Sequence, residues 1–350
     1  MAHVANITIQ SAKVAGDLTD YVVYVDLKDL GVPFWDTVAN GGGDIRVYKD
    51  DGVTELPREV VFCDTATDTG ELHFKYTGTL SSSSDTIVKI HADGVSSDYA
   101  VTATYGRNNV WSDYGIVYHD GSGQTDSTGN SRTTTLGGGL TAGGGTGKLG
   151  NSTDFDGTND NATIAGYDGV TGSDNRSYSF WINYTSTGTP DRPWVCGANA
   201  TNQKWTIRLA ETNGDALRVE TAGSYKIGTT SIGDGSWHLC HVVLDGTTLN
   251  DTDLYVDGSI EGSTSGSGLT NTINTATGNG MYFGYSPYTV DPGYIDMLFE
   301  EVRIYEGVRS ADWITTEYNN QNDTSTFYTV TDIGGASLST TKPMQPIWFM

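Results

Sequence analysis

Basic residues are scarce in this sequence. It holds 19 Lys and Arg against 43 Asp and Glu, which gives a formal net charge of −24. A surface of that charge repels the phosphates of nucleic acids and of anionic membranes, so we expect neither as a partner. The charge favours solubility, and clustered carboxylates are also the ligands that Ca²⁺ prefers. Both explanations of the acidic composition stay open.

Long apolar segments are missing as well. No run approaches the ~18 residues that a membrane helix needs, which argues against membrane insertion. The first residues, MAHVANITIQ, have neither the basic start nor the apolar stretch of a signal peptide. We therefore expect a soluble protein that is made in a cytoplasm.

Cysteine is rare too. Cys63, Cys196 and Cys240 lack the C-x-x-C spacing of a metal site, and three cysteines cannot all pair within one chain. Cys196 and Cys240 lie in the apolar runs PWVCG and WHLCHVVL, which favours buried free thiols. A single disulfide between these two is the alternative.

Helix-forming segments are few, whereas turn residues abound. The 45 glycines and the many Thr, Ser, Asp and Asn residues weaken helices and favour short strands joined by polar turns. One helix is predicted, with Ser310 as its N-cap and its end near Asn319. Strands are predicted at residues 7–9, 21–27, 45–48, 59–62, 72–76 and 86–90, and then at 115–119, 162–165, 178–183, 205–209, 217–220, 237–244, 254–256, 281–284 and 298–305.

The segment ELHFKY at residues 71–76 shows the period of a strand most clearly. Apolar and polar side chains alternate along it, and alternate residues of a strand point to opposite faces. We expect a half-buried strand, with Leu72 and Phe74 on the buried face and Glu71, His73 and Lys75 on the solvent face.

The pattern predicts an all-β protein of two tandem β-sandwich domains and a C-terminal arm. The first domain covers residues 1–108, the second and larger covers 109–322, and the arm covers 323–350. The arm ends in an apolar cluster that includes Ile347, Trp348 and Phe349. Such a cluster is unfavourable in water, so we expect it to dock either on its own chain or on a neighbouring subunit in an assembly.

A glycine-rich stretch at residues 136–150 has the look of a phosphate-binding loop. Ala142 and Leu149 stand where that motif needs Gly and Ser or Thr, and no strand–loop–helix context surrounds it. We expect a flexible surface loop.

The second domain resembles the laminin-G-like, concanavalin-A-like jelly roll. Six segments carry the resemblance in the family's order: DSTGN at 126–130, DFDGTND at 154–160, YSFWIN at 178–183, DGSWHLCHVVLDG at 234–246, LYVDGSIEG at 254–262 and FEEVRIYEGVRSADW at 299–313. The first domain resembles the domain of unknown function that often precedes such jelly rolls, through DLTDYVVYVDL at 17–27, FWDTVANGGGDIRVY at 34–48 and TGELHFKYTGTLSSSSDT at 69–86.

This resemblance implies a non-enzymatic structural or adhesive protein. Such domain pairs are common in bacteriophage virion proteins, which implies capsid decoration or a tail or head fibre at the virion surface. The partners would be other virion proteins or copies of the chain itself, with host surface glycans as ligands. The alternative is a secreted or cell-surface bacterial carbohydrate-binding module.

A glycoside hydrolase is a third hypothesis, which we do not favour. The Glu-x-Asp-x-x-Glu string of related jelly-roll hydrolases is missing. Glu300 and Glu301 are adjacent, so in a regular strand they would point to opposite faces and could not act on one sugar ring. We expect no catalytic residues and no enzyme activity.

A calcium site is predicted at the turn of residues 154–160. Carboxylate and amide oxygens gather there, and the family resemblance places the strand of Glu300 beside it. The alternative is that Asp156 merely closes the turn through bonds to the backbone. The predicted ligands are Asp154, Asp156, Asn159, Asp160 and Glu300.

Loop tyrosines are the predicted glycan platform, because flat aromatic faces stack on sugar rings and a few polar groups fix their orientation. The candidates are Tyr167, Tyr285, Tyr288 and Tyr294. Cross-strand packing or subunit contact is the alternative role for these side chains.

Overall fold

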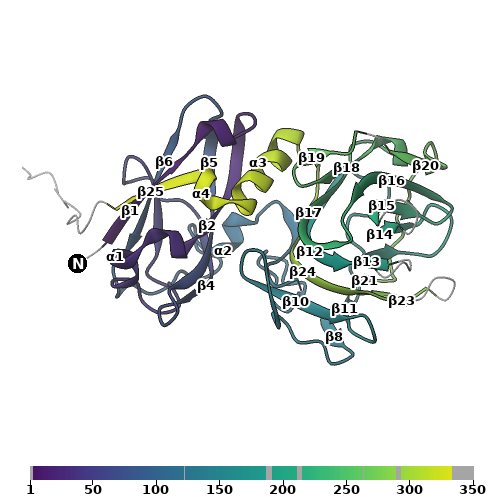
Figure 1. The fold of residues 1–350 in the computed structure, drawn as a ribbon, viewed down its shortest axis with the longest axis horizontal. Helices are drawn as coiled ribbons and strands as arrows, with labels where there is room; N and C mark the ends of the chain where they lie inside the picture. Colours follow the sequence, from purple (N-terminus) through teal and green to yellow (C-terminus); the bar gives the residue numbers. More distant parts are fainter. Residues whose placement is uncertain are drawn as a thin grey trace, which may run out of the picture.

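The protein folds into two β-rich lobes that lie side by side along its long axis (Figure 1). This computed structural model describes residues 3–121, 123–186, 191–210, 215–262, 264–288 and 293–332. Strands dominate both lobes, and α3 is the one helix longer than a single turn in these ranges. The predicted all-β class is confirmed.

The first lobe packs a four-stranded sheet, in the order β25-β1-β6-β3, against a three-stranded sheet, in the order β2-β5-β4. Apolar residues of both sheets, such as Ile7, Val23, Phe74 and Ile90, are buried between them. Its elements are β1 (His3–Ile9), η1 (Ser11–Lys13), β2 (Leu18–Asp26), η2 (Leu27–Leu30), α1 (Val32–Trp35), β3 (Arg46–Lys49), β4 (Arg58–Asp64), β5 (Thr69–Leu80), β6 (Thr86–Ala92) and α2 (Arg107–Val110).

The edge strand of this lobe comes from the far end of the chain. After α4 (Thr324–Phe327), β25 (Tyr328–Asp332) pairs antiparallel with β1. Phe327 and Tyr328 are buried in the first core, and the Tyr328 hydroxyl donates to Asp29 at 2.7 Å. The sequence assigns residues 323–350 to an arm, whereas in the structure the first part of that segment completes the first lobe. The predicted assembly residues Ile347, Trp348 and Phe349 lie outside the described residues.

The second lobe is a sandwich of two eight-stranded antiparallel sheets. The inner sheet, which faces the first lobe, has the order β19-β18-β17-β12-β24-β10-β9, with β7 paired to β24; the outer sheet has the order β20-β16-β15-β14-β13-β21-β11-β8. The elements are β7 (Tyr114–Tyr118), β8 (Thr135–Gly137), β9 (Gly145–Thr146), β10 (Asn151–Asp156), β11 (Asn161–Ile164), β12 (Arg176–Thr185), β13 (Asp191–Gly197), β14 (Lys204–Ala210), β15 (Ala216–Thr221), β16 (Ser224–Ser231), β17 (Asp234–Leu244), η3 (Leu249–Asp251), β18 (Thr252–Val256), β19 (Ser259–Ile260), β20 (Ser265–Ser267), β21 (Met281–Phe283), β22 (Tyr285–Ser286), β23 (Gly293–Tyr294) and β24 (Asp296–Tyr305).

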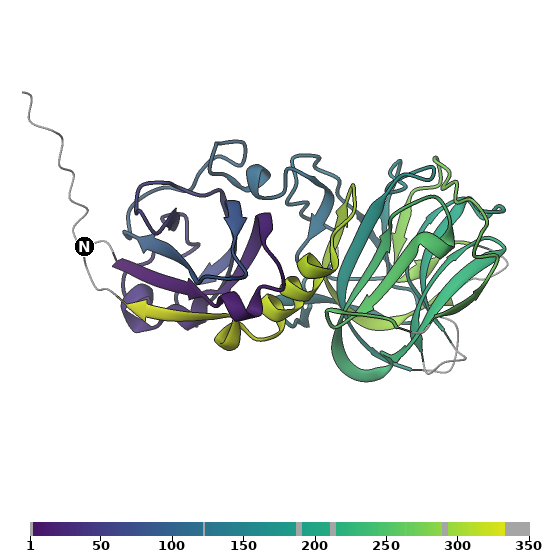
Figure 2. The same cartoon turned by 90° about the horizontal axis from the view of Figure 1, so that it is seen from above.

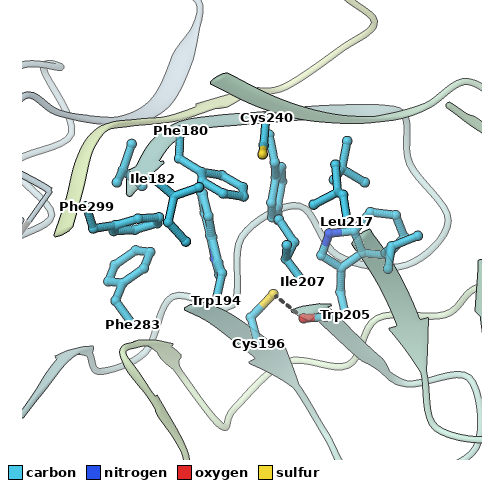
Figure 3. Packing of buried hydrophobic residues seen from close by; sticks show 14 of the residues in the cluster. Phe180, Ile182, Trp194, Cys196, Trp205, Ile207, Leu217, Cys240, Phe283 and Phe299 are labelled. Atoms are coloured by element: carbon cyan, nitrogen blue, oxygen red, sulfur yellow. Dashed lines mark hydrogen bonds between the residues drawn. The ribbon is translucent and has the colours of Figure 1, made fainter. Parts of the chain in front are cut away.

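Aromatic residues from both sheets fill the core of the second lobe (Figure 3). Phe180 and Cys240 extend from the inner sheet toward Trp194, Cys196 and Trp205 of the outer sheet. Cys196 donates from its Sγ to the Trp205 carbonyl oxygen at 3.3 Å. All three cysteines of the chain are free and buried, so free thiols are confirmed and the alternative of a disulfide is wrong.

A β-bulge interrupts β24 at Glu301. The register against β12 runs from Ser179 opposite Arg303 to Trp181 opposite Glu300, which leaves one extra residue in β24. Glu301 takes a φ of 52°, in the left-handed region that non-glycine residues rarely adopt. The extra residue sends both Glu300 and Glu301 to the face toward the first lobe. The expectation that they point to opposite faces is therefore wrong.

Helix α3 (Ala311–Asn322) lies between the two lobes (Figure 2). Ser310 caps it by accepting from the Trp313 backbone N–H at 3.2 Å, as the sequence predicts. Trp313 packs into the first core, with its ring 4.9 Å from that of Tyr21, while Ile314 packs on the inner sheet beside Val243. The helix thus joins the two lobes through opposite faces.

Within the described ranges, no helix combines the length and the apolar character that a membrane crossing requires.

We predict that β25 stabilises the first lobe. A chain that ends at Phe327 should have a lower free energy of unfolding than a chain that ends at Asp332. The shorter chain lacks the buried Tyr328 ring and one row of sheet hydrogen bonds. Removal of a buried aromatic side chain alone costs about 3–5 kcal/mol. Urea unfolding of the two truncated chains measures the difference, and equal midpoints would contradict the role of β25.

Candidate functional site

The polar face of β5 is buried, although the sequence predicts it to be exposed. Glu71 is 2% exposed, His73 is 1% exposed and Lys75 is 8% exposed. The alternating pattern is correct, but the inner sheet of the second lobe covers the face that the prediction assigns to solvent. A strand with charged side chains on a buried face requires partners for each of them.

His119, directly after β7, is the main partner from the second lobe. It donates through Nδ1 to Glu301 Oε1 at 2.6 Å and through Nε2 to Glu59 Oε2 at 3.1 Å. Its Nδ1 also lies 3.4 Å from Glu71 Oε1. The His119 ring stacks on that of His73 with centroids 4.7 Å apart, and His73 Nε2 lies 2.8 Å from Glu71 Oε1. Five side chains from the two lobes thus meet in one buried cluster.

Arg303 extends this cluster along the inner sheet. Its guanidinium donates to Glu301 on one side and to Glu317 of α3 on the other. Glu317 in turn accepts from His241 Nε2 at 2.9 Å and from Gln321 Nε2 at 3.4 Å. The chain of bonds therefore runs from β5 of the first lobe through β24 to the helix between the lobes.

The electrostatics of the cluster separate its members into charged and neutral groups. Burial alone would lower the pKa of His119, but Glu301 and Glu59 raise it well above its ordinary value. Burial would raise the pKa of Glu301, but His119 and Arg303 hold it well below its ordinary value. These two residues form a charged pair.

Glu71 and His73 are shifted in the other direction. Burial and the nearby Glu301 raise the pKa of Glu71 well above its ordinary value. Burial and the charge of His119 lower the pKa of His73 well below its ordinary value. Both shifts favour the neutral form of the side chain.

Glu300 is held separately by the glycine-rich loop. Its Oε1 accepts from the backbone N–H groups of Lys148 and Leu149 at 2.7 and 2.8 Å. Burial, followed by the charge of Glu301, raises the pKa of Glu300 to about 8. A Cβ atom at Gly147 would lie 1.6 Å from Glu300 Oε2, so only glycine permits this approach. The loop that the sequence predicts to be a flexible surface segment closes over this carboxyl group.

A cavity of about 300 Å³ opens beside the cluster, between the two lobes. Its lining includes Glu59 and His119 together with Arg58, Asp98, Tyr99 and Ser127. Ser127 donates to Glu59 Oε1 at 2.6 Å, and Arg58 pairs with Asp98 at 2.7 Å. The cavity connects the buried histidine with the surface of the molecule.

Three of the four predicted platform tyrosines gather at the edge of the second lobe. Tyr285 and Tyr294 stack across the β22–β23 hairpin with centroids 4.7 Å apart, and Tyr282 packs edge-on against Tyr285 at 6.3 Å. The Tyr288 hydroxyl donates to the Gly197 carbonyl oxygen at 2.6 Å. These four rings are half-exposed, and we call Tyr282, Tyr285, Tyr288 and Tyr294 the tyrosine rim.

Tyr167 does not join them. Its ring lies 4.0 Å from the Arg132 guanidinium and packs against the core of the second lobe. Burial raises the pKa of its hydroxyl. Tyr167 thus has the packing role that the sequence leaves as its alternative.

A group of cations lies next to the tyrosine rim on the outer sheet. Lys204, Arg208 and Arg218 all pair with the single carboxylate of Glu220, Arg208 at 3.3 Å and Arg218 at 2.6 Å. Lys204 Nζ also lies 5.6 Å from the centre of the Tyr288 ring. Three cations in one place stand out in a chain with 19 basic residues.

The predicted calcium ligands are not brought together. Asp156 accepts from the backbone N–H groups of Thr158 and Asn159 at 2.8 and 3.2 Å, and Asp160 accepts from the N–H of Asp156 at 3.2 Å. The turn is thus closed by its own side chains, which agrees with the alternative that Asp156 bonds to the backbone of the turn. Asp154 is exposed on β10, and Glu300 binds the glycine-rich loop instead. Calcium binding at this turn stays a prediction.

No pattern in the sequence predicts the buried cluster. Glu59, Glu71, His73, His119 and Glu301 come from four separate segments, and none of these has the ligand spacing of a metal or catalytic motif. Two local signals are present in the sequence. Charged residues alternate with apolar ones in β5, and in β24 two acidic residues stand shortly before Arg303. These signals do not reveal that the second lobe covers β5 and so buries its charged residues.

The comparisons with known proteins agree with the fold of the second lobe. Residues 156–315 match the laminin G family model described as the concanavalin A-like lectin/glucanases superfamily. The second lobe is a concanavalin A-like jelly roll, with a laminin-G-like domain at residues 156–315. The resemblance of the first domain to the domain of unknown function stays a prediction. A search of curated proteins finds no match.

Several solved structures are similar to part of this chain at low sequence identity. Domain 4 of AbnA, an extracellular GH43 arabinanase from Geobacillus stearothermophilus, has a TM-score of 0.47 and 20% identity, and the match covers 58% of this chain and 97% of that one. The binding domain of Paraclostridial Mosquitocidal Protein 1 has a TM-score of 0.42 and 12% identity over 59% and 52% of the two chains. The ligand binding domain of botulinum neurotoxin serotype D has a TM-score of 0.40 and 9% identity over 60% and 51%. The match thus spans about half the length of the toxin domains.

We predict that Glu317→Gln weakens the interface between the lobes. The substitution leaves the buried Arg303 with one carboxylate fewer, and breaking a buried ion pair costs about 3–5 kcal/mol. Burial opposes the shift, but Arg303 and His241 hold the pKa of Glu317 below its ordinary value. A lowered carboxyl pKa contributes stability at neutral pH that is lost as the pH falls toward the folded-state pKa.

Urea unfolding at a series of pH values between neutral and acidic conditions tests this. The difference between the native chain and Glu317→Gln should be largest near neutral pH and should narrow as the pH falls. Glu306→Gln, which changes an exposed carboxylate next to the same strand, serves as the matched control and should have little effect. A difference that does not depend on pH would contradict the role assigned to the charge of Glu317.

Proposed function

We propose that this protein is a non-enzymatic carbohydrate-binding protein whose ligand rests on the tyrosine rim. The observation that carries the proposal is the contact of Tyr282, Tyr285 and Tyr294, which are half-exposed and lie together at the edge of the jelly roll. Aromatic faces give a sugar ring an apolar surface to stack on. The core of the second lobe already has its own aromatic residues, so these rings are not needed to fill it.

Polar groups beside the rim would fix the orientation of the sugar. Lys204 lies over Tyr288, and the paired groups Arg218 and Glu220 follow on the neighbouring strand. A cavity of about 320 Å³ lies over these strands, with Asn199 and Ser224 also in its wall. Alternating donors and acceptors of this kind suit the hydroxyl groups of a saccharide.

The proposal includes no hydrolytic step. What supports this is the position of the acidic residues: Glu300 and Glu301 are buried between the lobes, and Glu220 is neutralised by three cations. A glycosidase needs two carboxyl groups that face one sugar ring. At the tyrosine rim, the described residues supply no such pair.

Two of the similar structures are described with a saccharide bound, arabinotriose for the AbnA domain and N-acetylneuraminic acid for the botulinum domain. Those ligands belong to those proteins. The present proposal rests on the tyrosines of this chain and does not name the saccharide.

The setting we propose is the surface of a phage particle, as capsid decoration or as part of a tail or head fibre. The resemblance of the two domains to such proteins supports it, and the acidic surface suits an exposed, soluble component. A secreted or cell-surface bacterial module is the alternative setting for the same binding site.

We predict that glycan binding depends on the stacked rings of the tyrosine rim. The double variant Tyr285→Ala, Tyr294→Ala should lose glycan binding, because stacking on these two rings is the main apolar contact. Glycan-array screening of the native chain identifies a ligand, and calorimetry with that ligand should show a loss of at least about 10-fold in affinity, the effect of ~1.4 kcal/mol. Tyr105→Ala, which removes a half-exposed tyrosine of the first lobe, is the control. Unchanged affinity in the double variant would rule out the rim.

The second prediction concerns the setting. Cryo-electron microscopy of the particles or cells that contain this chain should find it at symmetric positions on a capsid, tail or fibre. A chain found only as free protein, or only on a bacterial surface, would overturn the virion setting. That result would leave the binding site to be judged by the first experiment.

A further inference from the structure

We propose that Glu71, His73, His119 and Glu301 form a binding site for a divalent transition-metal ion of the zinc type between the two lobes. Each residue offers one ligand atom, and these four atoms lie within 4.8 Å of one another. All four side chains are buried. The first lobe supplies two ligands and the second lobe supplies the other two, so the ion would bind both lobes at once.

The spacing of the four atoms suits a tetrahedral site. With metal–ligand bonds of about 2.0–2.2 Å, neighbouring ligands of a tetrahedral ion lie about 3.3–3.6 Å apart. His119 Nδ1 lies 2.6 Å from Glu301 Oε1 and 3.4 Å from Glu71 Oε1, and His73 Nε2 lies 2.8 Å from Glu71 Oε1. Shifts of less than about 1 Å in these contacts would make room for the ion. Hydrogen bonds hold the same atoms together when no ion is bound.

The chemistry of the donors selects the kind of ion. Two imidazole nitrogens and two carboxylate oxygens suit Zn²⁺, Co²⁺ or Mn²⁺, whereas Ca²⁺ and Mg²⁺ prefer oxygen ligands alone. This site is therefore distinct from the calcium site that the sequence predicts at residues 154–160, both in place and in the ion it would take.

Groups behind the ligands hold them in the required orientation. Glu59 accepts from His119 Nε2 at 3.1 Å, which leaves Nδ1 to face the other ligands. A carboxylate behind a metal-bound histidine is the usual arrangement in metalloproteins. Arg303 fixes the other oxygen of Glu301, and Ser127 fixes Glu59 at 2.6 Å. These three hydrogen bonds come from groups that are not ligands themselves, and they indicate that the site is preorganised.

The balance of charge also favours a cation. Glu59, Glu71 and Glu301 are buried together, and in the described part of the interface the positive groups that pair with them are Arg303 and the charged His119, which would lose a proton on binding the ion. Burial of several carboxylates is unfavourable unless positive charge accompanies them. A divalent ion would supply that charge at the centre of the group.

The ion could reach the site through the interlobe cavity. His119 and Glu59 line this cavity, so the imidazole of one ligand borders a space of about 300 Å³.

Titration of the metal-free full-length chain with Zn²⁺ tests the proposal. We expect about one ion bound per chain, a higher melting temperature in Zn²⁺, and reversal by a transition-metal chelator but not by a calcium-selective one. Co²⁺ bound in place of Zn²⁺ should give the visible absorption of a tetrahedral site. No binding of either ion by the native chain, or no change in melting temperature, would overturn the proposal without any variant.

Two variants and a control locate the site. His73→Ala removes a ligand and should abolish binding, while Glu59→Gln keeps all four ligands and should weaken binding about 10–100-fold. His238→Ala is the matched control, because His238 bonds to Asp257 and Asp234 at the periphery of the inner sheet. Equal binding in His73→Ala and the native chain, or loss in His238→Ala, would place the ion elsewhere and overturn the proposal.

Discussion

The ion pair between Arg303 and Glu301 is the interaction on which the arrangement of the two lobes depends. Arg303 bridges Glu301 of the inner sheet and Glu317 of α3, and Glu301 in turn holds His119 against β5. Several carboxyl groups are buried in this interior, and each unpaired charge there would cost several kcal/mol. The lobes can pack only in the one arrangement that pairs these groups. This requirement makes the interface specific in a way that apolar contact alone does not.

The pairing depends on a local distortion of the backbone. In a regular strand Glu301 would point into the core of the jelly roll, where Val302 now lies. The β-bulge turns Glu301 outward, at the cost of a left-handed φ of 52° that amounts to about 1–3 kcal/mol. Contacts with His119 and Arg303 offset that cost. The strained residue is thus also the centre of the charge network.

Most of the fold could be predicted from the sequence, but the cluster could not. Alternation in segments such as ELHFKY identifies strands, and Ser310 identifies the start of α3, because these signals are local. The burial of Glu71 and His73 depends on a second lobe, and the period of a strand cannot distinguish solvent from another domain. The bulge at Glu301 leaves no mark on composition, and β25 depends on pairing with β1 from the opposite end of the chain. Three tyrosines of the rim could be predicted, because a group of tyrosines in a loop is itself a local signal.

The buried cluster and the tyrosine rim lie on different sheets of the second lobe. The cluster lies between the inner sheet and the first lobe, whereas the rim lies on the outer sheet and its hairpin, and facing sheets are separated by about 10 Å of packed core. Side chains that far apart without shared partners contribute nearly independently to stability. A change at the interface therefore alters how firmly the lobes are joined without altering the surface of the rim. The joined lobes therefore hold the rim in one fixed direction, away from the first lobe (Figure 1).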